Sequence, residues 1–196
     1  MTRPLALYLR SRSAPATLAI MAGCAIGLGA LEPTVDDPIS RSRLALLATA
    51  LAVAAIGPGL AGADLDLDRL SGFAWPPRRA AYLIIGAAVA AGLIAATTLV
   101  GDPMTDVNRI ARDAAGFTGL VGLGAAGLGA SRAPLVPVLW TVVVLGVQPP
   151  ADRTDLVVLS WMAQPVGSLT GAATVTGVVI AVVGTLAYAT CGPRRQ

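Results

Sequence analysis

Between Arg79 and Asp102 the chain carries no charged residue. A helix rises about 1.5 Å per residue, so this stretch is long enough to cross a hydrocarbon core of about 30 Å. A helix that is apolar on every side is stable only when it is surrounded by other apolar groups or by lipid. The sequence therefore predicts a membrane-spanning helix over residues 80–101.

The rest of the chain is of the same kind. Hydrophobic residues make up 55% of it and charged residues 13%, whereas soluble domains carry about 25% charged residues. Apolar stretches between charges predict six spans, at residues 15–31, 44–63, 80–101, 114–130, 133–147 and 166–190. We therefore expect an all-α polytopic membrane protein in which residues 1–196 form a single transmembrane domain.

Six spans place both termini on one side of the membrane. With that side cytoplasmic, the inner segments hold 9 arginines and the outer segments 5. The positive-inside rule then predicts cytoplasmic termini in a multi-pass protein of the plasma membrane. All 14 basic residues are arginine, a bias typical of a GC-rich bacterial genome. Because these arginines lie at span ends and not on one face, they do not indicate a nucleic-acid partner.

Residues 156–164, between the fifth and sixth spans, are too few to cross a membrane. They suit a short interfacial or re-entrant helix on the outer side, with Trp161 at headgroup depth. They could also begin a long sixth helix that is kinked at Pro165. We favour the separate short helix.

Small residues recur at helical spacing in two spans. In lipid, helices associate through close backbone approach, which small residues allow. The candidate helix-packing residues are Gly122, Ala126 and Ala130 in the fourth span and Gly177 and Gly184 in the sixth. A Gly-rich substrate path is the functional alternative, and ordinary packing is the interpretation we favour.

The chain is poor in groups that do chemistry. It has no histidine and no lysine, which excludes a Ser–His dyad, a zinc-protease helix and a P-loop. The alternating carboxylates at 64–68 lack the further carboxylate that a calcium loop needs, so we interpret them as a solvated loop. We expect no catalytic residue, no cofactor and no metal, and therefore no enzyme.

Arg109, Arg112 and Asp113 lie at the start of the fourth predicted span. Ionisable residues within a membrane mark a functional path by default. Arg112 and Asp113, next to Arg109, could line an outer cavity, or they could be a boundary pair whose stems reach along the helix to the interface. We favour the boundary interpretation.

The order of parts resembles the membrane subunit of a small ABC-2-type ABC exporter. That family has six spans with cytoplasmic termini and short helices on the outer side between the fifth and sixth spans. Residues 2–12 would be its amphipathic first segment, 64–79 its contact with the ATPase and 156–164 its outer helices. Stretches such as Trp161-Met-Ala-Gln-Pro and the closing Gly-Pro-Arg-Arg also look like permease components from actinobacterial genomes.

The resemblance implies an ATP-driven exporter whose path lies between two permease subunits, of the same or different chains, in membrane lipid. A cytoplasmic ABC ATPase would contact Leu70, Phe73 and Trp75, since aromatic side chains are common anchors of interfaces. The two aromatic rings could equally belong to an interfacial belt.

Two other functions remain open. The chain could be a non-transporting assembly or regulatory subunit whose small-residue faces bind another membrane protein. It could also be an intramembrane enzyme, which the poor inventory of reactive side chains disfavours. A neighbouring reading frame for a P-loop ATPase would favour the exporter.

Overall fold

A computed structural model of the chain describes residues 13–61, 75–100, 105–147, 159–164 and 170–194. Every regular element in these ranges is helical. The α-helices are α2 (Ala14–Leu31), α3 (Pro38–Ala54), α5 (Trp75–Thr97), α6 (Val107–Leu128), α7 (Leu135–Val147) and α9 (Thr170–Cys191). The 3₁₀ turns are η1 (Glu32–Thr34), η2 (Gly57–Leu60) and η3 (Trp161–Ala163).

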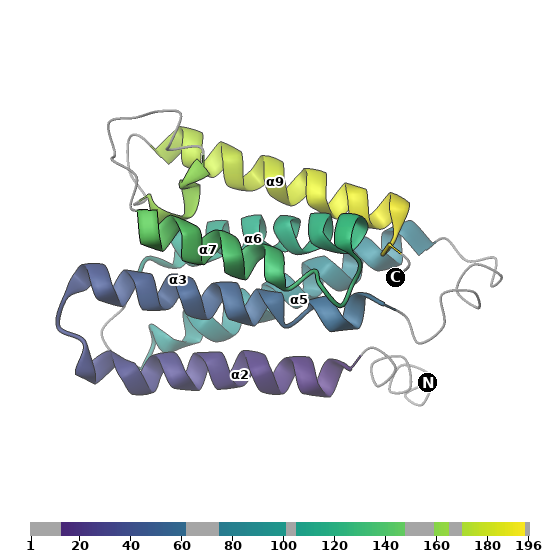
Figure 1. Cartoon of the computed structure of the whole chain (residues 1–196). Coiled ribbons are helices and arrows are strands. Elements are labelled where there is room, and N and C mark those ends of the chain that lie inside the picture. The colour runs from purple at the N-terminus through teal and green to yellow at the C-terminus, as the bar shows by residue number, and fades with distance from the viewer. Residues whose placement is uncertain (1–12, 62–74, 101–104, 148–158, 165–169, 195–196) are drawn as a thin grey trace.

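The helices form a bundle in which each runs roughly opposite to the one before it (Figure 1). The start of α2 and the end of α9 therefore lie at the same end, which we call the terminal end; the opposite end is the distal end. Four segments are long and apolar enough to cross a membrane: 14–34, 38–60, 76–97 and 171–191. The chain thus has the helices of a multi-pass membrane protein.

Three helices begin before the apolar stretch that predicted them, because charged residues do not prevent a helix from forming. Asp37 caps α3 by accepting hydrogen bonds from the backbone N–H and the hydroxyl of Ser40, at 2.9 and 2.7 Å. Asp106 caps α6 by accepting from the N–H of Asn108. Such carboxylates satisfy N–H groups that a helix start leaves without partners. Arg41 and Arg43 were expected before the second span, and they instead lie in the first turns of α3.

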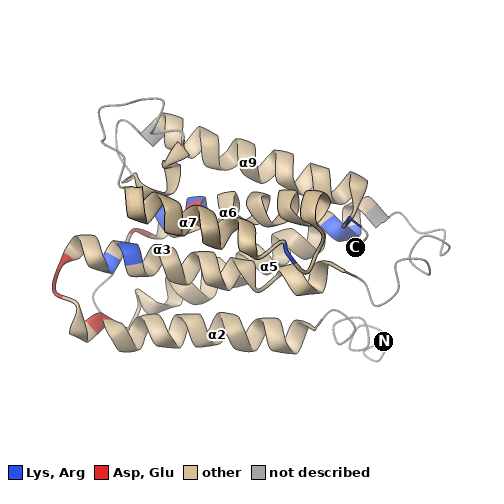
Figure 2. Cartoon of the chain, in the orientation of Figure 1, with Lys and Arg blue, Asp and Glu red and all other residues tan. Residues whose placement is uncertain are grey.

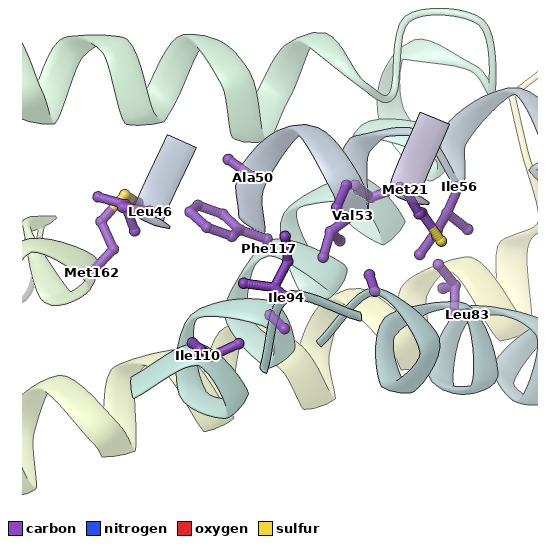
Figure 3. Close-up of a cluster of buried hydrophobic side chains, with 14 of the residues drawn as sticks. Met21, Leu46, Ala50, Val53, Ile56, Leu83, Ile94, Ile110, Phe117 and Met162 are labelled. Carbon is purple, nitrogen blue, oxygen red and sulfur yellow. The ribbon is translucent and has the colours of Figure 1, made fainter. Parts of the chain in front are cut away.

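Helix α6 is the centre of the bundle and contacts α3, α5, α7 and α9. Its Phe117 side chain is fully buried, and Figure 3 shows it among Leu46, Ala50 and Ile94. The four candidate spans do not include α6, whose first turns are polar. Its neighbours, not its own hydropathy, therefore give α6 an apolar environment.

At the terminal end, cationic groups lie at the carboxyl ends of two helices. Arg194 donates from its backbone N–H to the Ala125 carbonyl (3.0 Å) and from Nη1 to the Gly127 carbonyl (3.1 Å). Gly192 ends α9 at a φ of 71°, and a Cβ there would collide with the Arg79 guanidinium. Positive charge is favourable where helix carbonyls point outward, so these contacts fix the end of α9 against α5 and α6.

Candidate functional site: an ion cluster under a helical strap

Helix α6 carries Arg109, Arg112 and Asp113 on one face, because residues three and four apart are neighbours on a helix. The Nε and Nη2 atoms of Arg112 lie 3.0 and 2.9 Å from Oδ1 of Asp113. The Nε of Arg109 lies 3.7 Å from Oδ2 of the same carboxylate. Arg112 is 7% exposed and Asp113 2%. These three residues, the ion cluster, therefore neutralise one another in part inside the protein (Figure 2).

The ion cluster has two guanidinium groups and one carboxylate, and both guanidinium groups also donate hydrogen bonds to backbone carbonyls. Residues 159–164, which we call the strap, pass over the distal end of α6 and include η3. Arg109 Nη2 donates to the carbonyls of Met162 (3.2 Å) and Ala163 (3.4 Å), and Arg112 Nη2 donates to that of Gln164 (3.0 Å). Charged donors make stronger hydrogen bonds than neutral ones. The two arginines therefore anchor the strap to α6.

Trp161 fixes the strap by packing. Its ring fills a slot where both walls are glycine: a Cβ on Gly116 would overlap the ring, and one on Gly177 would lie 3.3 Å from Cε3. The ring also meets Phe117 at a centroid distance of 5.8 Å and an angle of 56°. Trp161 is 1% exposed, so its ring faces the interior of the protein and not the surrounding lipid. It is a core residue that α6 and α9 enclose.

Two N–H groups in this site find no acceptor among the described residues: Nη1 of Arg112 and Nε1 of Trp161. Both residues lie against Gly177, since a Cβ there would be 3.4 Å from Cγ of Arg112. A buried donor without a partner costs about 1–3 kcal/mol. The contact between the strap and α6 thus includes the free-energy cost of these two donors, which the packing and the charged hydrogen bonds of the strap offset.

We expect Trp161→Phe to lower the free energy of unfolding by no more than about 1.5 kcal/mol, because the new ring still fills most of the slot. The indole N–H that is lost makes no hydrogen bond within the described part of the chain. Thermal unfolding of the purified protein in detergent measures the change. A loss above about 3 kcal/mol would mean that the N–H has a partner whose hydrogen bond holds the strap.

The structure differs from the expectation that the Arg112 and Asp113 stems extend to an interface. Arg112 and Asp113 do not reach along the helix toward an interface; they are buried and paired. The spacing of Arg109, Arg112 and Asp113 on one helical face was visible in the sequence. The strap that covers them follows more than fifty positions later, and no local pattern connects the two.

Of the candidate helix-packing residues, Gly122 and Gly184 come together. A Cβ on Gly122 would lie 2.5 Å from the carbonyl oxygen of Gly184. Gly119, which the small-residue pattern did not single out, meets the backbone of Ile180 and Gly184. Gly177 lies at the strap, as described above. Ala126 of α6 is half-buried, and Ala130, which lies just beyond the end of α6, is buried.

The candidate ATPase-contact residues lie mostly outside the described part. Leu70 and Phe73 fall in the range 62–74, which the structure does not describe, and Trp75 is the first residue of α5. No group of three His, Cys, Asp or Glu residues that could hold a metal occurs in the described ranges.

Comparison of the chain with protein-family models, curated proteins and solved structures finds no match. Any function must therefore be inferred from the residues and their geometry.

Proposed function

We propose that the chain is the transmembrane subunit of an ATP-driven exporter in a bacterial plasma membrane. It would form the translocation path with a second permease subunit and be powered by a separate ATPase. The observation that carries the proposal is the strap. A short segment between the fifth and sixth α-helices of the bundle folds back at the distal end, where the exporter layout has its outer helices.

In this proposal all six α-helices cross the membrane. Helix α6 would be about 33 Å long for its 22 residues, enough for the hydrocarbon core. Its ion cluster is tolerated because neighbouring helices and the strap cover it. Helix α7, with 13 residues, would reach about 20 Å and needs the turn before it to complete the crossing.

The charges support cytoplasmic termini. Described arginines at the terminal end are Arg78, Arg79, Arg132 and Arg194, and no described carboxylate lies there (Figure 2). At the distal end, Arg109 and Arg112 belong to the ion cluster, and the other arginines that the structure describes there are Arg41 and Arg43. The terminal end is thus richer in arginines that can face the aqueous phase, as cytoplasmic segments are.

The mechanism that follows is alternating access driven from outside the chain. ATP binding would bring two ATPase subunits together and press on Leu70, Phe73 and Trp75, the last of which is the first residue of α5. Helix α5 contacts both α6 and α9, so a shift of its terminal end is passed to the central helix. Movement of α6 relative to the strap would then separate the arginines from the strap carbonyls and open the distal end.

The test is to purify the tagged chain from its native membranes in mild detergent and identify co-purifying proteins by mass spectrometry. We expect an ABC ATPase, and we expect the Phe73→Ala, Trp75→Ala variant to lose it. Trp140→Phe, near the middle of α7, is the matched aromatic control and should retain it. Absence of an ATPase, or equal loss from both variants, would contradict the proposal.

One observation favours the non-transporting alternative, an assembly or regulatory membrane subunit. Beyond the ion cluster, the buried polar side chains in the described ranges are four threonines and one serine: Thr17, Thr49, Thr118, Thr141 and Ser160. The described part of a single copy thus has no lining of polar groups from one end to the other. In the same purification, this alternative predicts another membrane protein in place of the ATPase.

A further inference from the structure

An apolar groove lies between α2 and α5 at the terminal end. Its volume is about 480 Å³, and Ile56 of the segment after α3 lies at its base. Helix α2 lines it with Ala14, Thr17, Leu18 and Met21, and α5 lines it with Arg78, Ala81, Tyr82, Ile85, Gly86 and Val89. These residues recur every three or four positions, so each helix gives one continuous face to the groove.

The groove has a defined direction and length. Helices α2 and α5 both begin at the terminal end, so the groove runs from that end toward the middle of the bundle (Figure 1). From Arg78 to Val89 the rise of α5 is about 16 Å, which is about half of a 30 Å hydrocarbon core. The groove thus has the depth of one membrane leaflet.

Its inner surface offers little to a polar ligand. The hydroxyl of Thr17 donates to the carbonyl of Ala55 at 3.2 Å and is satisfied within the protein. Gly86 lets Ile56 pack directly against the backbone of α5, because a Cβ on Gly86 would lie 2.9 Å from Cδ1 of Ile56. An alkyl chain is the occupant that matches these walls in shape and polarity.

The opening of the groove is cationic. Arg78 is exposed at the beginning of α5, where the groove meets the terminal end. Arg79 follows it, and Arg194 lies at the same end. A ligand with a negative charge directly above its alkyl chain would be complementary to this group of arginines.

We propose that the groove binds an anionic glycerophospholipid, with one acyl chain between α2 and α5 and the phosphate on Arg78. The inference is independent of transport, since a lipid of this kind would occupy the groove in an exporter or in an assembly subunit. A basic residue near the headgroup strengthens binding of an anionic lipid by about fivefold.

The test uses the delipidated full chain in neutral detergent, titrated with dioleoylphosphatidylglycerol or dioleoylphosphatidylcholine and followed by native mass spectrometry. We expect phosphatidylglycerol to bind about fivefold more tightly. Arg78→Gln should abolish this preference and leave the phosphatidylcholine affinity unchanged. Ala81→Trp, which places a ring in the groove from an exposed position, should weaken both lipids by at least about tenfold.

Two matched variants separate this site from general effects. Arg132→Gln removes an exposed arginine at the same end outside the groove, and Ala88→Trp adds a ring to α5 outside it; both should leave binding unchanged. Equal affinity for the two lipids, or the same losses in the control variants, would overturn the proposal. A lipid-free dimer that Ala81→Trp dissociates would also overturn it, in favour of a second copy of this chain as the occupant.

Discussion

Replacing Arg112 by Ala should lower the free energy of unfolding by about 3–5 kcal/mol, because it leaves the Asp113 carboxylate buried without its main partner. The substitution also removes the hydrogen bond to the Gln164 carbonyl, so the strap loses one of its charged hydrogen bonds to α6. Asp113→Ala should cost a similar amount, since two guanidinium groups would then lie together without a carboxylate. Thermal and chemical unfolding of the purified protein in detergent measures both changes.

The double variant Arg112→Met, Asp113→Leu distinguishes two effects: the cost of leaving one buried charge without its partner, and the stability that the ion pair itself contributes. Replacing a buried ion pair by apolar residues of similar volume is often nearly neutral. We therefore expect the double variant to be more stable than either single alanine variant, a strong departure from additivity. Arg132→Ala, at an exposed position, should change stability by less than about 0.5 kcal/mol. If Arg112→Ala behaves like Arg132→Ala, the ion cluster does not hold the strap.

Gly119→Ala and Gly184→Ala should each lower the free energy of unfolding by about 3 kcal/mol, the upper end of the usual cost of overpacking. At both positions an added Cβ meets the backbone of the opposite helix and not a flexible side chain. The main chains of α6 and α9 would have to move apart, and the slot for Trp161 is built from the same two helices.

Gly127→Ala is the matched control for these variants, because it lies on α6 with nothing within 4 Å of an added Cβ. Alanine favours a helix over glycine, so Gly127→Ala should leave stability unchanged or raise it slightly. Unfolding in detergent again gives the comparison. Equal stability of Gly119→Ala and Gly127→Ala would mean that α6 and α9 do not approach through their backbones.

A helix could be predicted well where charged residues mark the ends of its apolar stretch. Helix α2 ends at Leu31, directly before Glu32, as the apolar stretch 15–31 predicts. The starts of α3, α5 and α6 were expected too late, because span prediction follows hydropathy whereas a helix begins at its cap. In α3 that cap is Asp37, several residues before the last arginine of the first turns.

The site could be predicted only in its parts. Arg109, Arg112 and Asp113 stood out as charges beside an apolar stretch, but their burial depends on the strap, whose contacts are tertiary. Gly177 was expected to pack helix on helix, and it instead forms a wall of the slot for Trp161. A glycine in the sequence shows that something approaches the backbone closely; it does not show whether that is a helix or an indole.

The distance in sequence between the ion cluster and the strap has a consequence for synthesis. Arg109 and Arg112 bond to residues that follow them by 53, 54 and 52 positions. At the usual rates of translation the ribosome needs about 3–10 s to supply that many residues. If α6 crosses the bilayer as we propose, it reaches the membrane before the segment that covers its charges. The nascent chain would then keep α6 at a protein surface, such as that of an insertase, until the strap and α9 arrive.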